Sequence, residues 1–166
     1  MPKKFILLTL LVFACATAFA QNTATVLFDD SWSFFRGGAL GAEKAGFDDS
    51  KWRKVDLPHD WSIEDLPGTA SPFNKGAISQ VGGGFTTGGT GWYRKTFTVP
   101  AHEKSKRVII QFDGVYMNPT IFINGVNIGQ HPYGYTSFWY DISGNVKFGV
   151  KNIIAVEVKN EGQNSR

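Results

Sequence analysis

The chain has 166 residues and nearly balanced charge, with 17 Lys and Arg against 14 Asp and Glu. Two of the lysines lie in the first 20 residues, and the other 146 residues contain 15 basic and 14 acidic side chains, a net charge of +1. No run of like charge occurs, so the composition indicates neither a nucleic-acid partner nor an anionic membrane surface. The length suits one domain with a sizeable apolar core.

Residues 1–20 have the three parts of an export signal. A basic start is followed by an apolar run at 5–13, too short to span a bilayer, and Ala18-Phe19-Ala20 is a small-x-small cleavage site. We therefore expect export to the periplasm and a mature chain beginning at Gln21. Lipidation of Cys15, giving an outer-membrane lipoprotein, is the rival interpretation, and secretion is a third. Because Cys15 is the only cysteine, the mature domain would have no disulfide.

The rest of the chain reads as an all-β protein, a β-sandwich. No segment repeats apolar residues every 3.6 positions, so helix should be scarce. Asp48 or Asp49 is expected to cap a short turn, and Pro58 disfavours helix at the residue before it. The expected extended segments, in chain order, are 26–28, 32–35, 55–61, 92–99, 107–113, two hairpin arms around 124–125, 138–141, 146–150 and 152–159.

Residues 107–141 carry the clearest pattern. Apolar and polar residues alternate from Arg107 to Asp113, as in a strand with one buried face. Asn124-Gly125 suits the positive φ angles of a two-residue type I′ hairpin. That turn predicts that Ile123 faces Val126 and that Ile121 faces Ile128, with Phe122 and Asn127 on the other side of the ribbon.

Five motifs in this order resemble the N-terminal sandwich of family 2 glycoside hydrolases, and they are most similar to the bacterial β-galactosidases. They are WRKVDLPHDW at 52–61, GWYRKTF at 91–97, FDGV at 112–115, INGVNIG at 123–129 and HPYGYTSF at 131–138, with YDIS following at 140–143. The resemblance covers nearly all of the chain after residue 25. It implies a jelly-roll sandwich, similar to galactose-binding domains, for residues 21–166.

The resemblance also implies what lies beyond this domain. In the family, Ser165-Arg166 would be followed by the last strand of the sandwich, an immunoglobulin-like domain and a catalytic barrel that supplies two glutamates. We therefore expect an N-terminal piece of a longer glycosidase, lacking the last strand or strands and inactive alone. Its partners would be a β-galactoside, the remaining domains of the same polypeptide, and in some cases further copies of the enzyme.

The segment between Asp65 and Gly91 is the longest without periodicity, and six of its last ten residues are glycine. It is either a plain surface loop or an arm that packs against another domain and presents polar groups to a sugar. By resemblance, this loop approaches the active site of the neighbouring barrel. The candidate substrate-binding residues are Asn74, Phe85, Thr86 and Thr87.

No catalytic, metal or cofactor site is expected within the chain. Glycoside hydrolysis by a retaining enzyme needs two carboxyl groups about 5–5.5 Å apart. The adjacent acidic pairs lie in turn-like contexts where capping is expected, and Asp60 and Asp113 are expected to bond backbone groups. The three histidines, His59, His102 and His131, lack ligand spacing. The two beside proline, His59 and His131, are interpreted as structural hydrogen-bonding groups.

Aromatic residues leave two functions open. An accessory domain of a β-glycosidase would use most of its large aromatics in the core, whereas a stand-alone carbohydrate-binding module would present an aromatic platform. The tryptophans are Trp32, Trp52, Trp61, Trp92 and Trp139, and we expect most of them in the core. Tyr133 and Tyr135, on a turn, are candidates for a contact surface. The sugar stays open, since β-glucuronidases and β-mannosidases have related sandwiches.

Overall fold

The computed structural model describes residues 24–64, 74–77 and 79–160. The predicted signal, Cys15, the expected start at Gln21, part of the long loop and residues 161–166 lie outside the described residues. Within the described part the chain is almost entirely strand and turn, with two single-turn 3₁₀ helices, η1 (Val81–Gly83) and η2 (Ala101–Glu103). No helix in these residues has the length and apolar character needed to cross a membrane.

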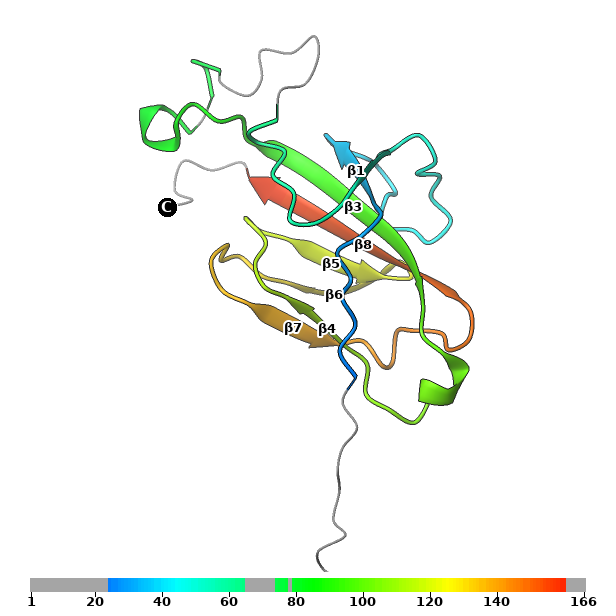
Figure 1. The fold of residues 1–166 in the computed structure, drawn as a ribbon. Coiled ribbons are helices and arrows are strands. Elements are labelled where there is room, and N and C mark those ends of the chain that lie inside the picture. The colour runs from blue at the N-terminus through cyan, green and yellow to red at the C-terminus, as the bar shows by residue number, and fades with distance from the viewer. Residues whose placement is uncertain (1–23, 65–73, 78, 161–166) are drawn as a thin grey trace, which may run out of the picture.

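The described residues form eight strands in two sheets (Figure 1). The larger sheet has the order β2-β1-β3-β8-β5-β6, and the smaller pairs β4 with β7, all antiparallel. The strands are β1 (Trp32–Arg36), β2 (Arg53–Val55), β3 (Gly89–Thr98), β4 (Ile109–Phe112), β5 (Thr120–Ile123), β6 (Val126–Gln130), β7 (Phe138–Asp141) and β8 (Lys151–Asn160). The all-β sandwich prediction is confirmed.

The main core lies between the two sheets. Ile154, Val156 and Val158 share one face of β8, and they are buried there against Ile110 of β4 and Phe138 of β7. Alternation along β3 and β8 sends their other side chains to the opposite face of the large sheet. A second, smaller apolar cluster lies on that face, where Trp92, Phe122 and Ala155 of the sheet are covered by the segment at residues 39–52. That segment contributes Ala39, Ala42, Phe47 and Trp52.

The Asn124-Gly125 hairpin forms as predicted, with φ of 52° and 89° at its two turn residues. Ile123 pairs with Val126 and Phe122 with Asn127, but Ile121 faces Gly129 instead of Ile128. The register shifts by one residue between Ile121 and Phe122, a β-bulge. The predicted Ile121–Ile128 pair is therefore wrong, because a bulge moves every partner beyond it by one position.

The predicted strand at 146–150 is also wrong. Only Phe148 pairs, in an isolated parallel bridge with Val99. The backbone of Lys147 is hydrogen-bonded to the side chain of Asn152 in both directions, at 2.7 and 2.8 Å. Asn152 is fully buried, and its amide also binds Val150 O and Asn124. The segment is therefore held by a side chain instead of a neighbouring strand.

Two cations on β3 hold coil segments on opposite faces of the large sheet. Arg94 is buried, donates to the carbonyls of Ala42 and Lys44, and stacks over the Phe47 ring. Burial lowers the pKa of Arg94, an effect that Asp49 opposes. Such a side chain fixes the 42–49 segment without any strand pairing.

Lys95, which interrupts the apolar face of β3, also has a defined role. Its ammonium binds the carbonyl oxygen of Phe28 at 3.2 Å and Asp30 Oδ1 at 2.9 Å, and it lies 4.5 Å from the Phe28 ring centroid. Phe28 in turn packs edge-on against Trp32 and Phe97. The 26–28 segment, predicted to be extended, is therefore attached by a cation and by ring contacts, and no strand is formed there.

Candidate functional site

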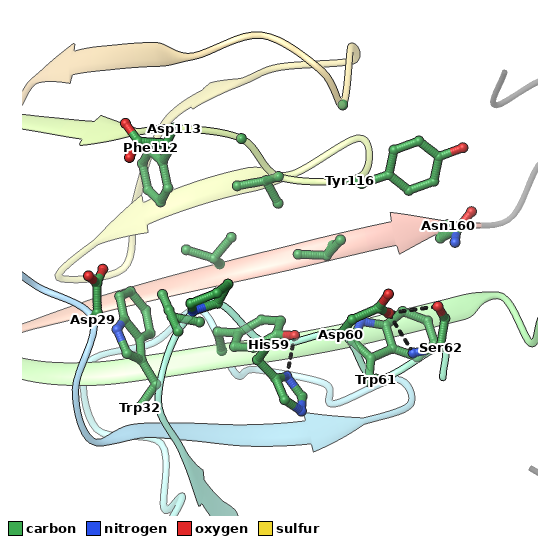
Figure 2. Close-up of a pocket in the computed structure, with 18 of the residues that line it drawn as sticks. Asp29, Trp32, His59, Asp60, Trp61, Ser62, Phe112, Asp113, Tyr116 and Asn160 are labelled. Carbon is green, nitrogen blue, oxygen red and sulfur yellow. Dashed lines mark hydrogen bonds between the residues drawn. The ribbon is translucent and has the colours of Figure 1, made fainter. Parts of the chain in front are cut away.

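A cleft of about 790 Å³ opens between the sheets (Figure 2). β4 and the residues after it form one wall, β3 and β8 form the floor, and residues 57–62 form the opposite wall. The cleft runs along β8, with Asp29 and Asp113 near one end and Tyr116 and Asn160 near the other. The lining also includes aliphatic and aromatic side chains: Trp32, Leu57, Ile110, Val115, Val156 and Val158.

His59 anchors the wall formed by residues 57–62. Its ring is largely buried, with Nδ1 2.8 Å from the Tyr93 hydroxyl of β3 and Nε2 2.7 Å from Glu64 Oε1. Glu64 also accepts hydrogen bonds from Arg53 of β2, at 2.6 and 2.9 Å. A second contact holds this wall against the segment before β1: the Leu57 N–H donates to the Asp29 carbonyl at 2.8 Å.

The charges in this network define the histidine tautomer. A carboxylate only accepts, so Nε2 carries a proton toward Glu64, and in the neutral form of the ring Nδ1 accepts from the Tyr93 hydroxyl. Burial raises the pKa of Tyr93 well above its usual range, and the charges of Glu64 and Asp60 add to that rise. Burial also acts to raise the pKa of Glu64, but hydrogen bonds from Arg53 and His59 outweigh it and hold that pKa below its ordinary value. The predicted structural role of His59 is confirmed.

Carboxylates stand at both ends of the cleft. Asp60 caps its own turn, accepting from the backbone N–H and the hydroxyl of Ser62 at 2.9 and 2.6 Å, as predicted for backbone bonding. Asp113 instead accepts from the side chain of Gln111 at 3.2 Å, so the backbone role predicted for it is wrong in the described part of the chain. The described lining includes no Lys or Arg. Nor do the described residues contain a group of three His, Cys, Asp or Glu able to hold a metal.

The four predicted substrate-binding residues lie on one arm, described at residues 74–77 and 79–88, that reaches the cleft only in part. Asn74 is exposed, and its backbone N–H donates to the Phe85 carbonyl at 2.9 Å. Thr86 lines the cleft beside Ser79, whose hydroxyl donates to the Thr86 carbonyl. Thr87 accepts a hydrogen bond from Arg36 of β1. Their role toward a sugar stays a prediction.

Arg36 is a contact that sequence reasoning missed. Its guanidinium lies 5.0 Å from the ring centroid of Trp61, on the cleft wall, while it binds Thr87 on the arm. One side chain therefore connects the arm to the wall. A charged residue at the end of a strand carries no periodic signal of a partner that lies 51 positions away.

The aromatics divide between core and surface. Trp32, Trp61 and Trp92 are buried, which confirms that most tryptophans belong to the core, while Trp139 is 58 % exposed. Tyr133 and Tyr135 are exposed as predicted, with ring centroids 5.7 Å apart, and the ring centroids of Tyr135 and Tyr116, at the cleft, are 5.4 Å apart. His131 stacks on Phe138, so it too is structural.

Comparison with known proteins identifies the family to which this sandwich belongs. A family model described as "Glycosyl hydrolases family 2, sugar binding domain" matches residues 18–165. The chain belongs to glycosyl hydrolase family 2. Within it, the "Beta-galactosidase BoGH2A" of Bacteroides ovatus is 48% identical over 140 residues, which are 84% of this chain and 16% of that protein. A "Putative beta-glucuronidase" of Formosa agariphila is 44% identical over 154 residues, 91% of this chain and 14% of that protein.

Solved family 2 structures show the same sandwich. A family 2 member from Bacteroides cellulosilyticus superposes with a TM-score of 0.80 at 55% identity, covering 82% of this chain and 18% of that chain. A Bacteroides uniformis β-glucuronidase gives 0.70 at 34% identity, covering 84% and 15%. This chain is thus similar to the sugar-binding domain of much longer glycosidases, and it spans about a sixth of the length of the relatives that it matches.

Proposed function

We propose that this chain is the N-terminal accessory domain of an exported retaining β-galactosidase. The observation that carries the proposal is the match to a β-galactosidase at 48% identity, over most of this chain but only 16% of that protein. The catalytic carboxyl groups would belong to another domain of the same polypeptide. The present domain would contribute a rigid sandwich and the arm at residues 74–88.

The geometry supports a role for that arm at the rim of an active site. Arg36 joins Thr87 to the Trp61 ring, so the arm is attached to the sandwich at Thr87, and the neighbouring Thr86 lies at the cleft. Asn74 and Phe85 are then held by the backbone bond between them. Polar groups placed on such an arm can orient a sugar for a neighbouring barrel.

The sugar is tested by expressing the longer polypeptide that begins with this chain. We expect it to hydrolyse p-nitrophenyl β-galactoside faster than the β-glucuronide or β-mannoside, and the 166-residue chain alone to hydrolyse none of them. Preferred cleavage of the glucuronide would instead support the second candidate, a β-glucuronidase, which the 44% identical relative favours. Hydrolysis by the chain alone would refute the accessory role.

The arm is tested in the same enzyme with paired variants. Asn74→Ala and Thr87→Val should raise KM for the galactoside more than they lower kcat, because they would remove binding groups without touching the carboxylates. Asn127→Ala, on the β5–β6 hairpin, is the matched control and should change neither. If the arm variants match this control, Asn74 and Thr87 are ordinary loop residues.

Export is tested by the N-terminus of the mature protein. In a bacterial host we expect periplasmic protein that begins at Gln21. Incorporation of labelled palmitate that is lost in Cys15→Ser would show lipidation instead. Uncleaved protein retained in the cytoplasm would contradict both forms of the export proposal.

A further inference from the structure

The side chain of Arg36 starts from a backbone that the large sheet holds firmly. Arg36 is the last residue of β1, and alternation puts it on the same side of the strand as buried Phe34. Its partner in the ladder is Gly91 of β3, and the next residue, Gly37, donates its N–H to β3 at 2.8 Å. The position from which the guanidinium reaches the arm is therefore fixed by two strands.

The indole of Trp61 gives this guanidinium a rigid surface. Trp61 is 4% exposed and lies against Gly91, where an added Cβ would be 3.0 Å from the indole Nε1. Arg36 Cζ is 5.0 Å from the centroid of the ring. A cation over an aromatic face is attracted by the ring quadrupole, and a planar guanidinium suits such a position. The long side chain of Arg36 is thus braced before it reaches its hydrogen-bond partner.

The hydrogen bond between Arg36 and Thr87 can have only one direction. Guanidinium nitrogens donate and never accept, so Nη2 of Arg36 donates and the Thr87 hydroxyl oxygen accepts. A hydroxyl that accepts in this way keeps its own hydrogen for another partner. Among the described residues no acceptor for that hydrogen is found. The Thr87 hydroxyl is therefore a donor whose oxygen is held in place.

The backbone around Thr87 leaves the direction of this donor open. Hydrogen bonds such as the one from Ser79 Oγ to the Thr86 carbonyl, at 2.8 Å, join arm residues to one another. Residues 88–89, which connect Thr87 to the rest of β3, are both glycine, and φ is 119° at the second of them. Glycine adopts positive and negative φ with similar ease, so this connection can bend in many ways. The contact with Arg36 selects one arrangement.

We propose that Arg36 is a positioning residue for glycoside binding: braced on Trp61, it fixes the Thr87 hydroxyl as a donor to an oxygen of the sugar. The inference rests on the proposed function, because the sugar would be bound by a neighbouring domain. Thr87 is not in the described lining of the cleft, although Thr86 and Gly88 are, so the sugar oxygen would lie outside the cleft. Arg36 itself would not touch the sugar.

The test is a double-mutant cycle in the longer polypeptide, with the p-nitrophenyl glycoside that it cleaves fastest. Arg36→Met retains an unbranched stem but no charge and no donor, and Thr87→Val removes the hydroxyl. Each should raise KM by about fivefold, the effect of one hydrogen bond, and change kcat little. Because Arg36 acts through Thr87, the double variant should also lie near fivefold, and not near the roughly 25-fold of two independent effects.

Conservative variants separate positioning from a general loss of structure. Arg36→Lys retains a cation and a donor and should restore most of the affinity that Arg36→Met loses, while Thr87→Ser retains the hydroxyl and should bind substrate as the original enzyme does. Arg107→Met is the matched control, since Arg107 binds Asp141 at 3.0 Å, and it should change neither KM nor kcat. If circular dichroism shows that Arg36→Met is unfolded, Arg36→Gln takes its place in the cycle.

Hydrogen exchange in the same polypeptide tests the brace without any substrate. Peptides that cover residues 79–88 should exchange about threefold faster or more in Arg36→Met than in the original, and at the original rate in Arg107→Met. This measurement makes the two proposals separable. If no glycoside is cleaved, the proposed function fails, and the exchange rates still report whether Arg36 holds the arm.

Three results would overturn the inference. One is a double variant whose rise in KM equals the product of the two single rises, because Arg36 would then act independently of Thr87. Another is an unchanged KM in Arg36→Met or a raised KM in Thr87→Ser. The third is exchange at residues 79–88 that Arg36→Met leaves as it was.

Discussion

Glu64→Gln tests whether the polar network holds the cleft wall. The carboxylate accepts one hydrogen bond from largely buried His59 and two from Arg53, whose side chain is 46% exposed. The exposed pair should contribute about 0.5 kcal/mol and the more buried bond to His59 about 1–1.5 kcal/mol. Because the amide of Gln retains one acceptor, we expect a loss of about 1.5 kcal/mol at pH 7, measured by urea unfolding.

The stability lost in Glu64→Gln should depend on pH, and the direction follows from the pKa of Glu64. The pKa of Glu64 is lower in the folded chain than its ordinary value of 4.5. A depressed carboxyl pKa stabilises the fold above the unfolded pKa, and that stabilisation is lost as the pH falls through the folded pKa. The difference between the original chain and Glu64→Gln should therefore be constant above about pH 5.5 and shrink below pH 4.5.

Glu103→Gln is the matched control. The pKa of Glu103 is also lowered, chiefly by a hydrogen bond from Lys106, but this side chain lies on η2, away from the cleft. We expect a smaller loss than for Glu64→Gln. Equal losses at the two positions would show that both act as ordinary surface carboxylates. A Glu64→Gln difference that persists unchanged at pH 3 would refute the ionic part of the reasoning.

Three further substitutions test the scaffold by urea unfolding. Gly91→Ala places a Cβ 3.0 Å from Trp61 Nε1 and 3.2 Å from Phe34, and should cost about 1–3 kcal/mol and shift the Trp61 indole NMR signal. Gly125→Ala should cost about 1 kcal/mol, since φ is 89° there; no loss would contradict the turn assignment. Asn152→Ala breaks four hydrogen bonds and should cost about 3 kcal/mol, more than exposed Asn127→Ala.

The sequence predicted those parts of the fold that depend on residues close together in the chain. The Asn-Gly turn and the strands at 32–35, 138–141 and 152–159 depend on neighbours two to four positions apart, and the structure confirms them. The slipped Ile121–Gly129 register was not predictable in this way, because Gly129 lies under the Tyr140 ring, and an added Cβ would be 2.3 Å from Tyr140 Cε1. That constraint comes from another strand, ten or more residues along the chain.

The candidate site was less predictable than the fold. The cleft is formed by segments that are far apart in sequence, and its key contacts join single polar residues, as in His59 with Tyr93 and Arg36 with Thr87. Their partners lie 34 and 51 positions apart, so no periodic pattern reveals them. A histidine after proline and an arginine at the end of a strand have many roles, and only the fold selects among them.

The two walls of the cleft are held by different forces, and this difference decides which of them can move. The β4 wall is fixed by a ladder to β7 and by apolar packing, as in Ile110. The opposite wall depends on the hydrogen bonds of His59 and on one backbone bond from Leu57. Such bonds can lengthen and re-form individually, whereas a ladder must slip by whole residues. The 57–62 wall is therefore the one that can move, and Glu64→Gln should loosen it without disturbing the ladder between β4 and β7.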